Sequence, residues 1–387
     1  MGRIFVAVPL IAAFTLITTT CTSEGAWDTI RRQQALASQN LIWRLRVPLT
    51  LDNSVEPSDT LLDFPVLVLL DGTNIDMSRF APGGRDIRFH AEPVNGRMPH
   101  EMPALAHEVE HWDREGISAV WVRVPRIPAG SSDTRIWLYL DNPTATDRQR
   151  PADVWSNGYA GVWHLNEAGP PYRDSGPNAL HGTTGTDGFT APERVPGSVY
   201  GYAQDFRANL TPDRGIIVRA DPVITGLGPL TLSFWIRLET AVNGARLMHK
   251  GPMELWISNG NPEFAVGYSE QKLFRSFTNP WNPGSWQNLS VRWTGEPDPD
   301  GITLYRDGQN FDPVFNSAIP IGERTLDQDR DLIIGNVSFG PPRPTPGELS
   351  SVQLSSVVRS AGWIGATHRG FTGGFVSFGT PEAVHYR

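Results

Sequence analysis

The sequence predicts an all-β protein built from two β-sandwich domains in series. Residues 230–238 place apolar side chains at every second position, which is the period of a strand with one buried face. Similar short runs recur along the chain between turn residues, with 38 Gly and 33 Pro in 387 residues. Only 19% of the residues are charged and 13 are Trp, which favours short strands joined by tight loops.

The first 26 residues have the pattern of an export signal. Arg3 precedes a mostly apolar stretch at residues 4–17, which is typical of a secretory signal rather than a spanning helix. Cys21, the only cysteine of the chain, lies where lipoproteins carry their lipid, although residues 18–20 do not fit the pattern expected before it. We therefore expect residues 1–26 to be removed or to serve as an anchor. The protein is then exported to the periplasm, outer envelope or extracellular space.

Residues 27–155 form the first predicted domain. Residues 43–49 alternate between apolar and polar side chains, whereas residues 64–70 are continuously apolar, as in a strand buried on both faces. Three more strands are expected at residues 86–90, 119–124 and 135–140, with turns at 83–84, 113–116 and 141–143.

The motifs of residues 40–145 resemble a bacterial domain family of unknown function, DUF2341. They are FPVLV at 64–68, GRDIRF at 84–89, HEVEHW at 107–112, VWVRVP at 120–125 and IWLY at 136–139. Members of this family often precede a laminin-G-like domain, and many occur with TolQ/ExbB/MotA-type proton-channel proteins. The resemblance implies a membrane-protein partner of that kind and no known activity.

Residues 156–387 form the second predicted domain, after a boundary at residues 145–165. Strands are expected at residues 201–206, 230–238, 285–293, 302–308 and 331–335. A short helix is expected at residues 360–369, with Ser360 as its N-cap and Trp363 on its buried face.

The pieces of residues 156–380 resemble the laminin-G-like, concanavalin A-like jelly-roll family, whose members mostly bind sugars or proteins outside the cytoplasm. The motif GVWHL at 161–165 and the turn at Asp174 match its first strand and turn. In related sandwiches Asp174 and an acidic pair near the last strand can hold calcium. Ser350 and Ser351 replace that pair here, which removes hard oxygen ligands and argues against calcium, with Asp174 the remaining candidate ligand.

The string from His107 to His111 has the HExxH spacing of a zinc protease. That chemistry needs a helix, which brings residues i and i+4 to one metal ion. Pro103 upstream, the turn at residues 113–116 and the valine-rich run that follows predict a strand instead. In a strand the two histidines are about 13 Å apart, so we expect polar residues on an exposed strand face and no zinc.

No pair of carboxylates has the spacing of a sugar-cleaving strand. The glucanases on this scaffold use an E-x-D-x-x-E strand, which is missing, and the acids at residues 296–300 are interrupted by prolines, which predicts a hairpin loop. Among the aromatic residues, Trp281 at the loop tip 279–284 is the candidate for stacking on a sugar ring, with a core position as the alternative. Trp286, beside it, is expected in the core.

These observations favour an exported, non-catalytic binding protein of the cell envelope that recognises a polysaccharide or an envelope protein. The alternatives are a structural accessory of a TolQ/ExbB-like machine and a glycan hydrolase whose site the sequence does not reveal. The net charge of −8 argues against a nucleic-acid partner. No cofactor is expected.

Overall fold

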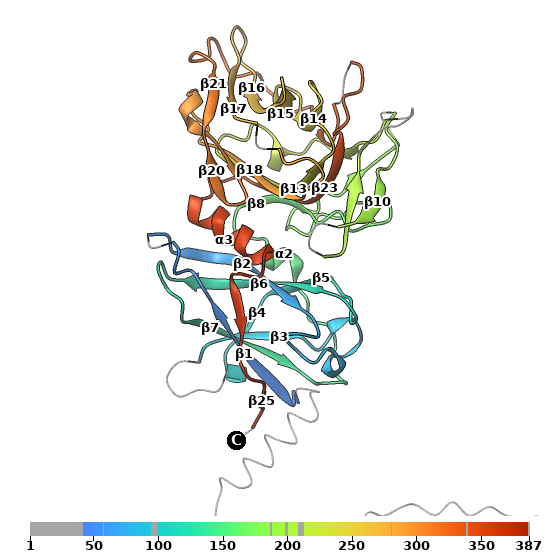
Figure 1. The fold of residues 1–387 in the computed structure, drawn as a ribbon, viewed down its shortest axis with the longest axis vertical. Helices are drawn as coiled ribbons and strands as arrows, with labels where there is room; N and C mark the ends of the chain where they lie inside the picture. Colours follow the sequence, from blue (N-terminus) through green and yellow to red (C-terminus); the bar gives the residue numbers. More distant parts are fainter. Residues whose placement is uncertain are drawn as a thin grey trace, which may run out of the picture. The chain divides into compact units, whose positions relative to one another are not determined.

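The first sandwich packs two antiparallel sheets against each other (Figure 1). The computed structural model describes residues 42–385 except 57, 94–98, 186–187, 198–199, 208–212, 280 and 338–339. Sheet A consists, in spatial order, of β24 (Val376–Phe378), β1 (Leu45–Leu51), β7 (Thr134–Leu140), β3 (Arg88–Ala91) and β4 (Ala104–Leu105), with β25 (Glu382–Ala383) also paired to β1. Sheet B consists of β2 (Leu61–Leu70), β6 (Ser118–Ile127) and β5 (His107–His111).

The second sandwich also has two sheets. Sheet C runs β10 (Glu193–Pro196), β11 (Tyr202–Asp205), β23 (Gly347–Ser355), β13 (Leu230–Leu238), β18 (Gln287–Trp293), β19 (Ile302–Arg306) and β20 (Gln309–Phe311), with β8 (Tyr159–Trp163) paired to β23. Sheet D runs β21 (Pro313–Asn316), β17 (Leu273–Phe277), β16 (Asn261–Val266), β15 (Met253–Ser258), β14 (Arg246–Lys250), β22 (Leu332–Ile334), β12 (Ile216–Val218) and β9 (Gly182–Thr183). The all-β prediction is confirmed.

Helices are short in the part of the chain that the structure describes. They are α2 (Pro151–Val154), α3 (Ala361–Phe371) and the 3-10 turns η1 (Met77–Arg79), η2 (Pro82–Gly84), η3 (Pro99–Glu101), η4 (Pro222–Ile224) and η5 (Pro299–Gly301). The predicted cap of α3 is confirmed, because Ser360 Oγ accepts the N–H of Trp363 at 3.1 Å. Trp363 is only 8% exposed, as expected for the buried face of the helix.

Strand β13 has the predicted bounds, but the prediction of a single buried face is wrong. Its apolar face lies in the core of the second sandwich, and Thr231 and Trp235 on the opposite face are 2% and 4% exposed. The cause is α3, which covers this face: the ring of Trp235 lies 5.2 Å from that of Phe371 and 5.8 Å from that of His368. Helix α3 therefore buries the face of β13 that the sequence pattern predicts to be exposed.

Within the compact unit of residues 43–384, the core of the first sandwich extends to residues of the second, among them Tyr159, Val162 and Trp235, whereas the core of the second sandwich is a separate cluster. Helix α3 lies between sheets B and C (Figure 1). Its Trp363 packs edge-on against Phe64 of β2 at 4.7 Å, and its Phe371 lies 5.6 Å from Trp121 of β6. Residues 64–70, the continuously apolar part of β2, are therefore covered on both faces, as predicted, whereas Leu62 near the start of the strand is 52% exposed.

The end of the described chain returns to the first sandwich. After α3, strands β24 and β25 pair with β1, where Leu51 faces Val376 and Arg46 faces Glu382. The range expected for the second domain, residues 156–387, therefore includes two strands that complete sheet A. Sequence order could not show this, because short strands at a chain end can join either sheet.

Candidate functional site

The outer face of sheet D carries a row of chemically varied side chains. Along β15 the odd-numbered residues are buried in the core, and Glu254, Trp256 and Ser258 face outward, half-buried. The antiparallel register sets the row, because directly opposed residues lie on the same face. The row consists of Arg246, Trp256, Glu263, Ser276 and Phe315, one from each of five neighbouring strands from β14 to β21.

Contacts join most neighbours in this row. The Arg246 guanidinium lies 4.3 Å from the centre of the Trp256 ring, and Trp256 Nε1 donates a hydrogen bond to Glu263 Oε1 at 3.0 Å. Ser276 Oγ donates to Glu263 Oε2 at 2.5 Å. Glu263 is 5% exposed, so both of its oxygens are held inside the surface.

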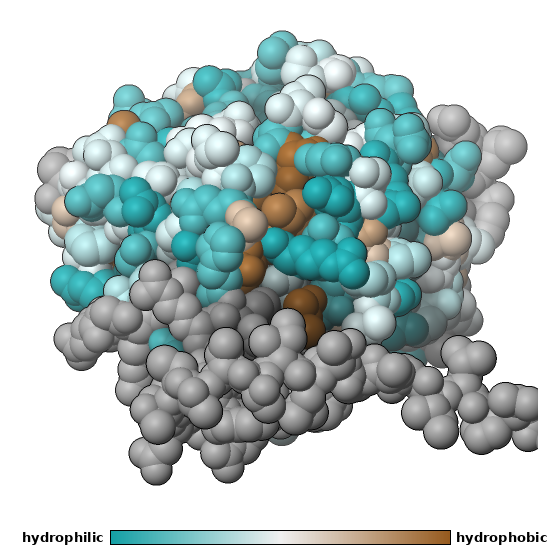
Figure 2. All heavy atoms as spheres, turned by 90° about the horizontal axis from the view of Figure 1, so that it is seen from below, coloured by the Kyte–Doolittle hydropathy of each residue, from teal (hydrophilic) through white to brown (hydrophobic). Residues whose placement is uncertain are grey.

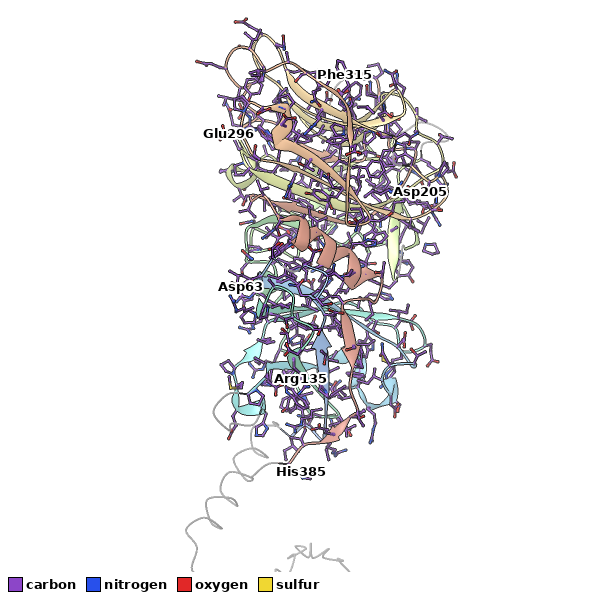
Figure 3. The ribbon with its side chains drawn as sticks, turned by 60° about the vertical axis from the view of Figure 1, so that its left-hand side comes forward. Asp63, Arg135, Asp205, Glu296, Phe315 and His385 are labelled. Atoms are coloured by element: carbon purple, nitrogen blue, oxygen red, sulfur yellow. The ribbon has the colours of Figure 1, made fainter. Side chains whose placement is uncertain are left out.

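Aromatic and cationic groups continue the row on β17 and β21. Phe315, 61% exposed, stacks on Phe274 with ring centres 5.6 Å apart. Lys272 Nζ lies 5.1 Å from the Phe274 ring, 5.3 Å from the Trp256 ring and 3.7 Å from Glu263. Figure 3 places Phe315 in the outer layer of the second sandwich, at the end of the molecule opposite Arg135.

Two hollows adjoin this row, the first at Trp256 and the second at Glu263, Ser276 and Phe315. The first, about 600 Å³, is lined by Arg207, Glu239, Thr240, Val242, Asn243, Gly244, Ala245, Trp256 and residues 342–346. The second, about 320 Å³, is lined by Ser258, Asn259, Asn261, Glu263, Lys272, Phe274, Ser276, Val314 and Phe315. Such concave surfaces, with rings and a few polar groups, are the usual form of ligand sites.

Most charges of the two hollows are already paired. Arg207 binds Asp205, Glu239 and Glu348, and hydrogen bonding to Asp205 raises the pKa of its guanidinium, against the effect of burial. Arg246, in the row beside the hollows, binds Glu254 at 2.8 Å, and burial lowers the pKa of Arg246 although Glu254 opposes the shift. The face therefore offers amides, hydroxyls and rings more than free charge.

The structure places the predicted residue Trp281 beside this site. Its indole Nε1 donates to the carbonyl of Gly260 at 3.0 Å, and its ring packs partly buried against the core of the second sandwich. Gly260 belongs to the turn between β15 and β16, next to Asn259 and Asn261 of the second hollow. Trp281 thus supports the turn that lines the hollow, and its indole N–H is already engaged within the protein.

Asp174 has a structural position. Its Oδ1 accepts the N–H groups of Val162 and Gly176, each at 2.8 Å, and its Oδ2 accepts that of Leu180 at 2.9 Å. It is 6% exposed and fixes the turn after β8. Cys21 and the expected leader lie outside the described residues.

The string from His107 to His111 forms strand β5, as predicted, but its expected exposure is wrong. Glu108 and Glu110 lie on the same side of the strand, since both carboxylates contact His164, although the register against β6 shifts between Val109 and His111. Glu108 is 6% exposed, because residues of the second sandwich cover that face. In the described residues, no group of three His, Cys, Asp or Glu side chains is arranged to hold a metal ion.

A buried ionic network joins β5 to the second sandwich. His164 lies between the two carboxylates, with Nε2 3.3 Å from Glu108 and Nδ1 3.2 Å from Glu110. Hydrogen bonds at 2.6–2.8 Å reach Glu108 from Trp155 and Ser175, and Glu110 from Trp121, Asn166 and Tyr200.

The protonation of this network follows from its charges. Burial alone lowers the pKa of His164, but Glu110 and Glu108 outweigh burial and raise it to about 9. Burial raises the pKa of Glu108, but His164, Ser175 and Trp155 bring it below its usual value. The imidazolium and the Glu108 carboxylate are therefore both charged at neutral pH, and both side chains are buried.

The sequence interpretation missed the row on sheet D. It assigned no strands between residues 238 and 285, where β14 to β17 lie. The alternation in MELWIS at 253–258, with Trp256 between polar neighbours on the outward positions, was the available signal. The cross-strand register that aligns Trp256 with Phe315 has no signature within a single strand.

Two family models match the chain in the predicted order. Residues 83–161 match the model of a domain of unknown function, DUF2341. Residues 213–365 match the model described as the Concanavalin A-like lectin/glucanases superfamily. The recognition of a DUF2341 domain followed by a laminin-G-like domain is confirmed. A search of curated proteins found no match.

Solved structures resemble the chain at low identity. The binding domain of Paraclostridial Mosquitocidal Protein 1 has a TM-score of 0.43 and 13% identity, covering 56% of this chain and 53% of that one. The binding domain of botulinum neurotoxin DC, solved with rat synaptotagmin II, has a TM-score of 0.41 and 10% identity, covering 56% and 52%. The chain thus spans about half of these domains.

A third structure is similar over almost its entire length. Domain 4 of AbnA, a GH43 extracellular arabinanase from Geobacillus stearothermophilus in complex with arabinotriose, has a TM-score of 0.40 and 16% identity. The alignment covers 54% of this chain and 96% of that domain.

Among the described residues, no helix is both long and apolar enough to cross a membrane.

Proposed function

We propose that the protein is an exported, non-catalytic binding protein of the cell envelope that holds a polysaccharide on the outer face of sheet D. The observation that carries the proposal is the row from Arg246 to Phe315 with its two hollows. The exposed ring of Phe315, backed by Phe274, suits stacking against the apolar face of a sugar.

Neutral polar groups next to the rings suit sugar hydroxyls. Asn243 and Thr240 line the first hollow, and Asn259, Asn261 and Ser258 line the second. Amide and hydroxyl groups both donate and accept hydrogen bonds, as a hydroxyl of a sugar does. A ligand rich in hydroxyls therefore matches this surface better than a strongly charged one.

The state of the carboxylates supports binding without turnover. Glycoside hydrolysis needs one carboxyl as acid and a second as base or nucleophile, placed on either side of the scissile bond. Glu239 and Glu254 are ion-paired to arginines, and Glu263 is held by Trp256, Ser276 and Lys272. An acid committed to such partners is poorly placed to exchange protons with a substrate.

An envelope protein is the second candidate ligand, and exposed apolar residues favour it. Five large hydrophobic side chains that are exposed in the described residues fall between positions 314 and 326: Val314, Phe315, Ile319, Ile321 and Leu326. They lie on or just beyond β21, an edge strand of sheet D. Exposed apolar patches at a sheet edge commonly mark protein contacts.

The opposite end of the molecule has a different surface. Seen from below, hydrophilic residues cover most of its described surface, and a narrow line of hydrophobic residues crosses it (Figure 2). The resemblance of the first sandwich to DUF2341 proteins suggests that this domain contacts a TolQ/ExbB-like membrane protein, a role compatible with ligand binding on sheet D.

Three assays on the purified protein test these functions. A glycan array and an envelope pull-down are run with Phe315→Ala and, as a matched exposed apolar control, Ile319→Ala. We expect glycan signal that Phe315→Ala lowers about tenfold, the loss of one stacked ring, and that Ile319→Ala leaves unchanged. Release of reducing sugar that survives repurification would contradict the non-catalytic role. Capture of an envelope protein sensitive to Ile319→Ala, with a silent array, would favour the second candidate.

The export proposal has its own test. The apolar stretch after Arg3 motivates it. Intact mass of the protein from the envelope fraction should show a shortened N-terminus, and Cys21→Ala should leave fractionation unchanged if no lipid is attached. A full-length cytoplasmic species would contradict export.

A further inference from the structure

We propose that the face of sheet D binds a glycan chain that spans both hollows, rather than a single sugar. This inference rests on the proposed function and specifies the form of its ligand. It follows from how the two hollows are joined, how far apart their ends lie, and which groups each of them presents.

The two hollows share a wall. The backbone N–H of Asn259, in the second hollow, donates to Oδ1 of Asn243, in the first, at 2.8 Å. Trp256 of the first hollow is joined in the same way to Glu263 of the second, through its indole N–H at 3.0 Å. A ligand in one hollow therefore lies directly beside the other.

The row is longer than one sugar ring. From Arg246 on β14 to Phe315 on β21 it crosses four strand spacings, about 19 Å, at right angles to the strands. Phe315 stands exposed at one end of this path. At the other end the exposed Arg343 lies in the first hollow and forms no ion pair with another described residue. A ligand that touches both ends must be a chain.

The groups along the path also repeat. Polar donors and acceptors come from Asn243 in the first hollow and from Asn259 and Asn261 in the second, with Trp256 and Phe274 beside them. A polymer with hydroxyls on every unit meets a suitable partner at each step, whereas a single sugar meets only one of the hollows. Binding energy should then accumulate with chain length.

The test measures affinity against chain length. Isothermal titration of the protein uses cello-, xylo- and arabino-oligosaccharides of two, four and six units, together with the parent polysaccharides. Phe315→Ala probes the second hollow and Arg343→Ala the first, with Leu62→Ala, at an exposed apolar residue of the first sandwich, and the exposed Arg126→Ala as matched controls. Circular dichroism of each variant checks that it is folded.

We expect affinity in one series to rise at least tenfold from the dimer to the hexamer, and both site variants to weaken the hexamer about tenfold. The two control variants should bind as the unaltered protein does. A dimer that binds as tightly as the hexamer, or a hexamer affected by one site variant alone, would overturn the spanning chain and leave the glycan function standing. No binding by any oligosaccharide or polysaccharide would overturn both.

Discussion

At the scale of single residues, the glutamates of β5 show that backbone geometry determines whether an HExxH string can bind a metal ion. On a helix, the spacing of His107 and His111 would bring both imidazoles to one metal ion. On a strand the same string aims Glu108 and Glu110 at one side, and both meet His164 of the second sandwich. The acids here hold two sandwiches together, and His107, 2% exposed, has its pKa lowered to about 4 by burial.

Removing Glu108 should destabilise the fold. Glu108→Ala leaves the buried His164 with one carboxylate fewer, and the donors Trp155 and Ser175 without their acceptor. Breaking a buried ion pair in this way typically costs about 3–5 kcal/mol. Urea unfolding should show this loss, whereas the exposed Glu115→Ala should change the free energy of unfolding by less than about 0.5 kcal/mol. A loss as small in Glu108→Ala as in the control would show that the network does not stabilise the protein.

The same network predicts how stability depends on pH. The pKa of His164 is raised from 6.5 to about 9, so its contribution is complete below about pH 6.5 and is lost as pH rises through 9. The pKa of Glu108 is lowered from 4.5, so its contribution is complete above that value and is lost as pH falls through the lower pKa. Thermal unfolding from pH 3 to 10 should give a plateau between these limits.

The variant His164→Gln tests whether His164 causes the loss of thermal stability at alkaline pH. It removes the group whose pKa is raised, so the fall in Tm between about pH 7 and 9.5 should be smaller than in the unaltered protein. If Tm falls equally in both proteins, groups other than His164 cause the loss of stability at alkaline pH.

At the scale of elements, the sequence predicted the strands and the helix cap that depend on neighbouring residues. It missed the contacts that depend on the pairing of distant segments. Strands β2 and β13 and the N-cap of α3 follow from alternation, apolar runs and Ser360, which act within a few residues. The burial of Trp235 on the polar face of β13 comes from α3, far along the chain. The row on sheet D was missed for the same reason, since Trp256 and Phe315 meet only through the register of the strands between them.

Strand β24 should be essential for the first sandwich. It covers the edge of β1, where Leu49 faces Phe378, and the preceding Phe375 packs 5.6 Å from Phe64 in the core. A chain that stops after Gly373 exposes this edge and opens the core beside it, so it should aggregate. Size-exclusion chromatography would show this. A chain that stops after Thr380 keeps β24 and should remain monodisperse, and equal behaviour of the two would contradict the role of β24.

At the scale of the whole molecule, the described sandwiches are joined more like the layers of one domain than like modules on a linker. Trp235, Tyr159 and Trp363 of the second sandwich belong to the same apolar cluster as the core of the first. The chain enters the second sandwich after α2 and returns through α3 to sheet A, so two connections cross the interface. Sheet C faces the first sandwich, which leaves the outer face of sheet D as the larger free sheet surface of the second (Figure 1).

The apolar cluster that crosses the interface predicts that the two sandwiches unfold together. Separating them would expose Trp235 and Trp363 and leave the charged network of Glu108 and His164 without partners, so a state with one sandwich folded is unfavourable. Differential scanning calorimetry should show a single transition with equal calorimetric and van't Hoff enthalpies. Residues 156–371 expressed alone should bind a hydrophobic dye through the exposed face of sheet C and α3. Two resolved transitions, or a stable isolated second sandwich that binds no dye, would show instead that the interface forms between domains that are stable on their own.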